Sequence, residues 1–173
     1  PDGYEAHALA SWGEAIGVAG NMPAWLPDGS NSAADQAVQM GMHHDGIEYF
    51  PLDGSRRGLL VMNHEYTDDG LLHRDGFKTW SAEKVRKSQA AHGVSVIEIE
   101  SNQTGAPTPW QMVRPSRYAR RFTAFSPFAV AGPAAGHALL RTAADPLGRT
   151  VLGTLNNCAS SQTPWGTYLS GEE

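Results

Sequence analysis

Glycine and proline interrupt this sequence along most of its length, with 19 Gly and 11 Pro among its 173 residues. Glycine tolerates backbone conformations that other residues avoid, while proline fixes φ and lacks a donor, so both favour turns. Regular elements must therefore be short, and several of the intervening runs consist of strand-forming residues. The pattern predicts a mainly β chain with short connector helices. A sandwich, a barrel and part of a propeller all fit this pattern, although no simple repeat is legible.

The expected strands lie between these interruptions. They cover residues 4–9, 43–50, 58–65, 94–100, 110–113 and 150–155, with a turn or loop over 102–109. The runs 43–50 and 58–65 flank a loop that contains Asp-Gly, and we expect them to pair as a hairpin. Residues 94–100 alternate most cleanly between apolar and polar side chains.

Two helices are expected as connectors. Ser32 can cap a helix over residues 33–40, with Asp35 placed to complete a capping box. Ser81 can cap a second helix over residues 81–92. The cations of the second helix are expected on a solvated face, namely Lys84, Arg86 and Lys87.

Composition limits the possible partners. The 13 Lys and Arg against 18 Asp and Glu give a formal charge of −5, and the basic residues form no run longer than a pair, which argues against nucleic acid. No stretch approaches the roughly 20 apolar residues that span a bilayer. The N-terminus lacks a signal-peptide pattern, and a single cysteine assigns no redox compartment. The sequence begins without Met and stops at its most chemically loaded stretch, so we expect it to be a piece of a longer polypeptide.

That stretch covers residues 155–173, LNNCASSQTPWGTYLSGEE. It predicts a strand that ends at residues 156–158, a polar loop turned by Pro164 and Gly166, and a second strand over 167–170. Such a hairpin brings its two ends together. Side chains from both ends are therefore expected to lie near each other.

Cys158 would then lie close to the adjacent Glu172 and Glu173. Successive residues of a strand point to opposite faces, so at most one of the two glutamates should share the Cys158 face. A thiolate is a soft ligand for iron or zinc, and carboxylates add charge and hard oxygen donors. The combination suggests a metal site. The alternative is a buried structural cysteine with solvated glutamates, and with Asn156 and Asn157 as turn formers.

The predicted hairpin collects polar groups at one end. One strand begins with His43, His44 and Asp45, and the other ends with Asn63, His64 and Glu65. Histidines with carboxylates suit zinc, but the spacing does not match the helical His-Glu-x-x-His pattern. Glu65 with Asp68 and Asp69 offers oxygen donors that suit calcium, and a solvated acidic loop is the alternative that the sequence supports better.

Several of these motifs together resemble the PhoX family of bacterial alkaline phosphatases. The matching blocks are Asn156-Asn157-Cys158-Ala159, Thr163-Pro164-Trp165-Gly166-Thr167 and Glu172-Glu173, preceded by Gly132-Pro133-Ala134-Ala135-Gly136-His137 and by Asn63-His64-Glu65. The resemblance implies a six-bladed β-propeller, Tat-dependent export to the periplasm or the extracellular space, and a phosphomonoesterase site that uses iron and calcium. At roughly 40 to 50 residues per blade, residues 1–173 would be a single β-rich segment with the first blades of a larger propeller and no second domain.

The resemblance also implies roles for individual residues. Cys158 matches the iron-binding thiolate of the family, and Glu172 and Glu173 match its acidic metal-binding motif, with Glu172 favoured. Glu65 is expected to bind calcium. The loop over 160–162 departs from the small residues that the family has at this point. The remaining ligands and phosphate-binding cations would lie beyond residue 173, in the rest of the propeller.

The resulting prediction is transfer of the phosphoryl group from a small phosphate monoester to water. Asn156 and Asn157 are the candidate catalytic residues that position the site, and Cys158 would be a metal ligand. A thiol nucleophile is the rival, but the arginine that follows the cysteine in the phosphate loop of cysteine-dependent phosphatases is missing here. Two further alternatives are a calcium-stabilised propeller module for binding or assembly and a related hydrolase on the same scaffold.

Overall fold

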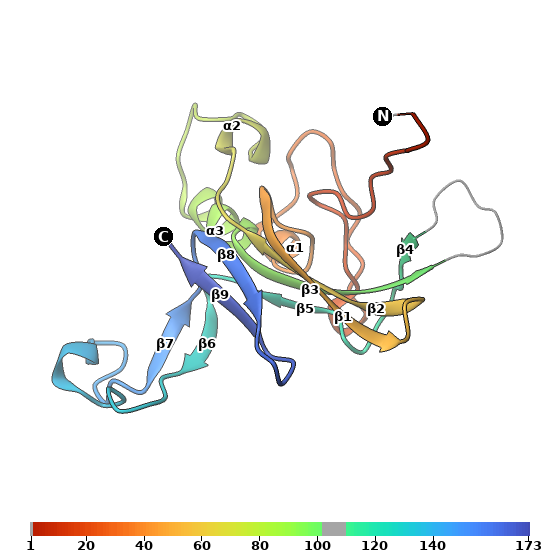
Figure 1. Cartoon of the computed structure of the whole chain (residues 1–173). Coiled ribbons are helices and arrows are strands. Elements are labelled where there is room, and N and C mark those ends of the chain that lie inside the picture. Colours follow the sequence, from red (N-terminus) through yellow and green to blue (C-terminus); the bar gives the residue numbers. More distant parts are fainter. Residues whose placement is uncertain (1, 102–109) are drawn as a thin grey trace.

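The structure is a computed structural model that describes residues 2–101 and 110–173, so the expected turn over 102–109 lies outside it. A five-stranded antiparallel sheet lies at the centre (Figure 1). Its strands are β1 (His44–Asp53), β2 (Arg57–His64), β3 (Gly93–Ser101), β4 (Trp110–Met112) and β5 (Arg120–Phe122). β1 pairs with β2 and β2 with β3, whereas β4 and β5 pair with opposite ends of the same edge of β3.

The predicted hairpin is confirmed. β1 and β2 pair from Ile47 opposite Met62 to Pro51 opposite Gly58. Gly54 lies in the connecting loop with a φ of 53°, a conformation that glycine adopts at low cost. The expected strands at 94–100 and 110–113 are also present, as β3 and β4.

Apolar side chains cover both faces of the sheet. One face packs into a core of Ile16, Met40, Met62, Ile97 and Ile99. The other face carries Val61, Val94 and Val96. Successive side chains of a strand point to opposite sides, so β2 and β3 supply both clusters. A sheet covered in this way gives a rigid base for groups at its edge.

The helices are short, as expected. They are η1 (Val18–Gly20), α1 (Ala33–Gln36), α2 (Asp69–Leu72), α3 (Ala82–Ala91) and η2 (Ala138–Leu140). The capping box between Ser32 and Asp35 is confirmed, but α1 ends at Gln36, earlier than residue 40. Ser81 caps α3 by accepting a hydrogen bond from the Lys84 backbone N–H at 3.2 Å.

The expectation that Lys87 lies on a solvated face is wrong. Its side chain is buried, and Nζ donates hydrogen bonds of 2.7 Å to the carbonyl oxygens of Gly29 and Leu72. These acceptors belong to loops distant in sequence, so the helical spacing of charges could not indicate them. Burial of the ammonium lowers the pKa of Lys87 below its usual value.

Two hairpins complete the fold. β6 (Ser126–Ala129) pairs with β7 (Thr150–Gly153), and β8 (Asn157–Gln162) pairs with β9 (Tyr168–Glu172). Figure 1 shows the β8–β9 hairpin lying against β1 and β2, while β6 and β7 extend away from the sheet.

The boundary between these hairpins differs from the prediction. The strand expected over 150–155 stops at Gly153, and residues 157–158 begin a strand where we expected one to end. Asn156 takes a φ of 50° between the two strands, a left-handed conformation that asparagine tolerates better than most residues. Residues 4–9, expected as a strand, are irregular.

The described residues are thus mainly β with few helices, and their strands form no closed barrel. Within the same residues, no helix combines the length and the hydropathy needed to cross a membrane.

Candidate metal centre

Three potential metal ligands converge where β1, β2 and β8 meet. They are Asp45 in β1, Glu65 directly after β2, and Cys158 in β8, and their ligand atoms all lie within 4.8 Å of one another. The pairing of β1 with β2 brings Asp45 and Glu65 together, since the Glu65 backbone N–H donates a hydrogen bond to the His43 carbonyl oxygen at 3.0 Å. β8 brings Cys158 from the other end of the sequence.

The thiol of Cys158 lies among negatively charged groups. Hydrogen bonding to Asp45, followed by burial and the charges of Asp45, Glu173 and Glu65, raises the pKa of Cys158 to about 11. Without a cation, the thiol therefore remains protonated at neutral pH, and only the thiolate is a nucleophile. A bound cation reverses this effect, because it stabilises the thiolate and the carboxylates together. The arrangement suits a metal ligand better than an attacking thiol.

In protein stripped of metal ions, Cys158 is expected to react with iodoacetamide about tenfold more slowly than an ordinary cysteine near pH 8. A pKa raised from 9.0 to about 11 lowers the thiolate fraction about 100-fold, and the greater nucleophilicity of a more basic thiolate offsets about tenfold of this. The rate should keep rising as the pH approaches the raised pKa. Mass spectrometry of the alkylated cysteine across the pH range measures this. A rate that levels off below pH 8 would favour the thiol nucleophile.

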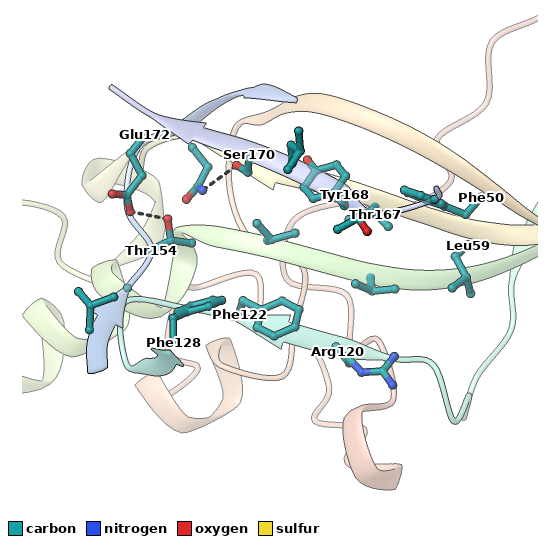
Figure 2. Close-up of a pocket in the computed structure, with 18 of the residues that line it drawn as sticks. Phe50, Leu59, Arg120, Phe122, Phe128, Thr154, Thr167, Tyr168, Ser170 and Glu172 are labelled. Carbon is teal, nitrogen blue, oxygen red and sulfur yellow. Dashed lines mark hydrogen bonds between the residues drawn. The ribbon is translucent and has the colours of Figure 1, made fainter. Parts of the chain in front are cut away.

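The structure separates the two glutamates at residues 172 and 173. Glu172 Oε1 accepts hydrogen bonds from Thr154 Oγ1 (Figure 2) and, at 2.8 Å, from the Leu155 backbone N–H, and Glu172 is not one of the three clustered ligands. The Glu173 charge, by contrast, is among those that raise the pKa of Cys158. This favours Glu173 over Glu172 as a further ligand, and the metal-binding role of either one stays a prediction.

The adjacent asparagines also take different positions. Asn157 is 2% exposed, and its Nδ2 donates to Ser170 Oγ at 2.8 Å on the face of β8 opposite Cys158. Asn156 is exposed, and its carbonyl oxygen accepts a hydrogen bond from the Glu173 backbone N–H at 3.1 Å. Neither side chain belongs to the cluster of potential ligands, and their catalytic role stays a prediction.

Asn157 instead lines an apolar hollow of about 840 Å³. The hollow lies between one face of the sheet and the two hairpins, and Figure 2 shows Phe50, Leu59, Phe122 and Phe128 around it. Its walls are mostly apolar, with Arg120 as the cation among the residues that line it. Such walls compensate little for the lost hydration of a phosphate dianion, so the hollow suits a phosphate ester less well than a site with bound cations.

The residues that suggested other metals have structural roles. His64 is fully buried, its Nε2 lies 2.6 Å from Ser95 Oγ, and burial holds its pKa well below the usual value. Asp68 caps α2, and Asp69 Oδ1 accepts a hydrogen bond from Ser88 Oγ at 2.6 Å. Among the described residues these carboxylates do not form a cluster with Glu65.

Asp45 is the potential ligand that the sequence did not assign. Its place at the polar end of the predicted hairpin was the available signal, because the pairing of the two strands brings their polar ends together. Nothing in the sequence distinguishes Asp45 from its neighbours His43 and His44 as a ligand. That choice depends on which side of β1 faces β8.

The comparisons with known proteins agree with this picture. The family model described as alkaline phosphatase PhoX matches residues 1–173. Among solved structures, the chain is similar to Pseudomonas fluorescens PhoX in complex with vanadate, a transition state analogue, with 46% sequence identity and a TM-score of 0.91. This match covers 100% of the chain and 29% of the Pseudomonas chain, so the sequence spans less than a third of that relative. No curated protein sequence matches significantly.

Proposed function

The chain belongs to the PhoX family of alkaline phosphatases, and from this premise we propose that it forms part of a metal-dependent phosphomonoesterase. The reaction is hydrolysis of a small phosphate monoester to an alcohol and inorganic phosphate. The vanadate bound to the Pseudomonas relative is named there as a transition state analogue, which supports phosphoryl transfer as the reaction.

The observation that carries the proposal is the convergence of Asp45, Glu65 and Cys158 within 4.8 Å. A phosphate monoester is an anion near neutral pH, and these three groups are potential anions as well. Direct contact between them would be repulsive. Cations held by the cluster convert this repulsion into attraction, so the cluster suits a phosphate substrate only as a metal site.

The donor set fits iron. A thiolate is a soft ligand and carboxylates are hard ones, a combination that suits a transition metal better than an alkaline-earth ion. Calcium takes roughly six to eight oxygen ligands, so Asp45 and Glu65 would supply only part of its shell, with Glu173 as a further candidate. The other calcium ligands would come from water or from other parts of the polypeptide.

The residues of this chain hold and orient the centre. When bound, iron and calcium would neutralise the phosphate oxygens and activate the attacking water. Cys158 serves as a ligand and not as the nucleophile, consistent with its raised pKa in the absence of a cation. Asn156 positions the site through its backbone carbonyl oxygen, which accepts a hydrogen bond from the Glu173 backbone N–H. Asn157 does so through its side chain, which donates a hydrogen bond to Ser170 Oγ.

The wider architecture is also part of the proposal. We infer that the sheet and its hairpins belong to a six-bladed propeller, and that the rest of this propeller is the partner of the chain. The similarity to the longer Pseudomonas structure supports this. Tat-dependent export to the periplasm or the extracellular space rests on family resemblance alone.

The test combines elemental analysis with hydrolysis of a chromogenic phosphate monoester by protein expressed from the complete coding sequence. We expect iron and calcium in the purified protein, turnover of the ester, and inhibition by vanadate. Calcium binding that raises the melting temperature without any turnover would favour the binding or assembly module. Turnover of a diester but not of a monoester would favour a related hydrolase.

A further inference from the structure

A buried side chain of β2 connects the β8–β9 hairpin to the sheet close to the candidate metal centre. This side chain is Asn63, in β2, and it is 0% exposed. It lies two positions before Glu65 and directly precedes the buried His64. A carboxamide buried so completely must find hydrogen-bond partners within the protein.

The side chain of Asn63 makes four hydrogen bonds, all to the hairpin. Its Nδ2 donates to the carbonyl oxygens of Cys158 at 2.9 Å and Ala159 at 3.1 Å. Its Oδ1 accepts from Tyr168 Oη at 2.8 Å and from Ser170 Oγ at 2.9 Å. The amide thus uses both donors and both acceptor positions, so no lone pair remains for a metal ion.

Only a carboxamide can make this set of bonds. An aspartate could accept from Tyr168 and Ser170 but would face the carbonyl oxygens of Cys158 and Ala159 with negative charge. An apolar residue would remove the shared donor of both carbonyl groups and the acceptor of the Ser170 hydroxyl, and it would leave the Tyr168 hydroxyl only the Gly46 carbonyl oxygen at 3.2 Å. Each such loss is costly in a buried place. The interaction therefore fixes the position of the Cys158 backbone relative to β2.

We propose that Asn63 is a positioning residue for the metal centre: it holds the backbone of Cys158 so that the thiol meets Asp45 and Glu65, and it is not itself a ligand. This inference rests on the proposed metal site. The convergence of the three ligands then depends on a hydrogen-bonded clamp between β2 and both strands of the hairpin. Ligand-orienting groups of this kind typically change metal affinity about 10- to 100-fold when they are removed.

Cobalt(II) provides a test that does not depend on turnover. Its bond to a thiolate gives a sulfur-to-metal charge-transfer band, which reports directly on Cys158. Metal-stripped protein from the complete coding sequence is titrated with cobalt(II), and we expect Asn63→Asp and Asn63→Leu to weaken the binding that produces this band about 10- to 100-fold. Tyr168→Phe removes the hydroxyl group that donates to Asn63 Oδ1 at 2.8 Å and that also lies 3.2 Å from the Gly46 carbonyl oxygen. It leaves the other three bonds of the Asn63 side chain in place and should give a smaller weakening in a protein that still folds.

Asn31→Leu is the matched control. Asn31 is also buried, at 8% exposed, and its side chain bonds to the backbone of Leu26 and Ala24 at 2.8 and 2.9 Å, away from the centre. It should lower the melting temperature but leave the cobalt titration unchanged.

The outcomes separate this inference from the proposed function. Wild-type affinity for cobalt in Asn63→Asp, Asn63→Leu and Tyr168→Phe would overturn the positioning role, while the metal site would stand. An equal loss in the Asn31→Leu control would also overturn it, because the effect would then follow from general destabilisation. Absence of the charge-transfer band in the wild-type protein would overturn the metal site and the clamp together.

Discussion

Replacing Cys158 with serine is expected to remove most of the iron from the complete protein and to lower phosphate ester hydrolysis by at least about 100-fold, at the upper end of the effects seen when metal-ligand support is lost. The substitution changes the volume of the side chain little. It replaces a soft thiolate with a hydroxyl group, which does not ionise near neutral pH. Asp45 and Glu65 would keep their positions. The loss would therefore come from ligand chemistry and not from a change of fold.

The measurement is iron content together with kcat and KM for a chromogenic monoester. Ser161→Ala is a suitable control, because Ser161 is an exposed residue of the same strand, and it should leave both quantities unchanged. If Cys158→Ser keeps its iron and its turnover, then Cys158 is neither ligand nor nucleophile. If iron is retained but turnover is lost, the thiol nucleophile becomes the better explanation.

Local patterns predicted those elements that local interactions determine. Ser32 and Ser81 begin helices because their side chains accept hydrogen bonds from backbone N–H groups within the next turn. β1 and β2 were predictable for a similar reason, since an Asp-Gly loop joins two β-prone runs. The convergence of Cys158 with the end of β9 followed from the polar turn between them, and Asn157 does pair with Glu172.

The sequence failed where distant segments decide the outcome. Lys87 belongs to a charged helix face, yet loops from elsewhere supply carbonyl oxygens that make its burial possible. The sequence also did not indicate that Thr154 would engage the Glu172 carboxylate, and the choice between Glu172 and Glu173 as a metal ligand stays a prediction. Asp45 was overlooked because its role depends on β8, which is far from it in sequence but lies against β1 in space.

Gly46 lies at a close contact between β8 and β1, and Gly46→Ala is expected to weaken metal binding about 10- to 100-fold. A Cβ at residue 46 would lie 2.6 Å from Cβ and Oγ of Ser160 and 2.8 Å from the carbonyl oxygen of Cys158. These distances are too short, so β8 must move outward, and overpacking of this kind typically costs about 1 to 3 kcal/mol. The movement would carry Cys158 away from Asp45, the residue next to Gly46.

Gly171→Ala and a double variant show whether this contact is the cause. Gly171 lies in β9 of the same hairpin, and a Cβ there would come no closer than 3.9 Å to Ala159, so Gly171→Ala should bind iron normally. Adding Ser160→Gly to Gly46→Ala removes the two contacts at 2.6 Å but keeps the one with the Cys158 carbonyl oxygen. We therefore expect partial recovery of iron content and of melting temperature. Normal iron content in Gly46→Ala alone would mean that the centre tolerates a shift of β8, and that close contact between the strands does not determine the ligand geometry.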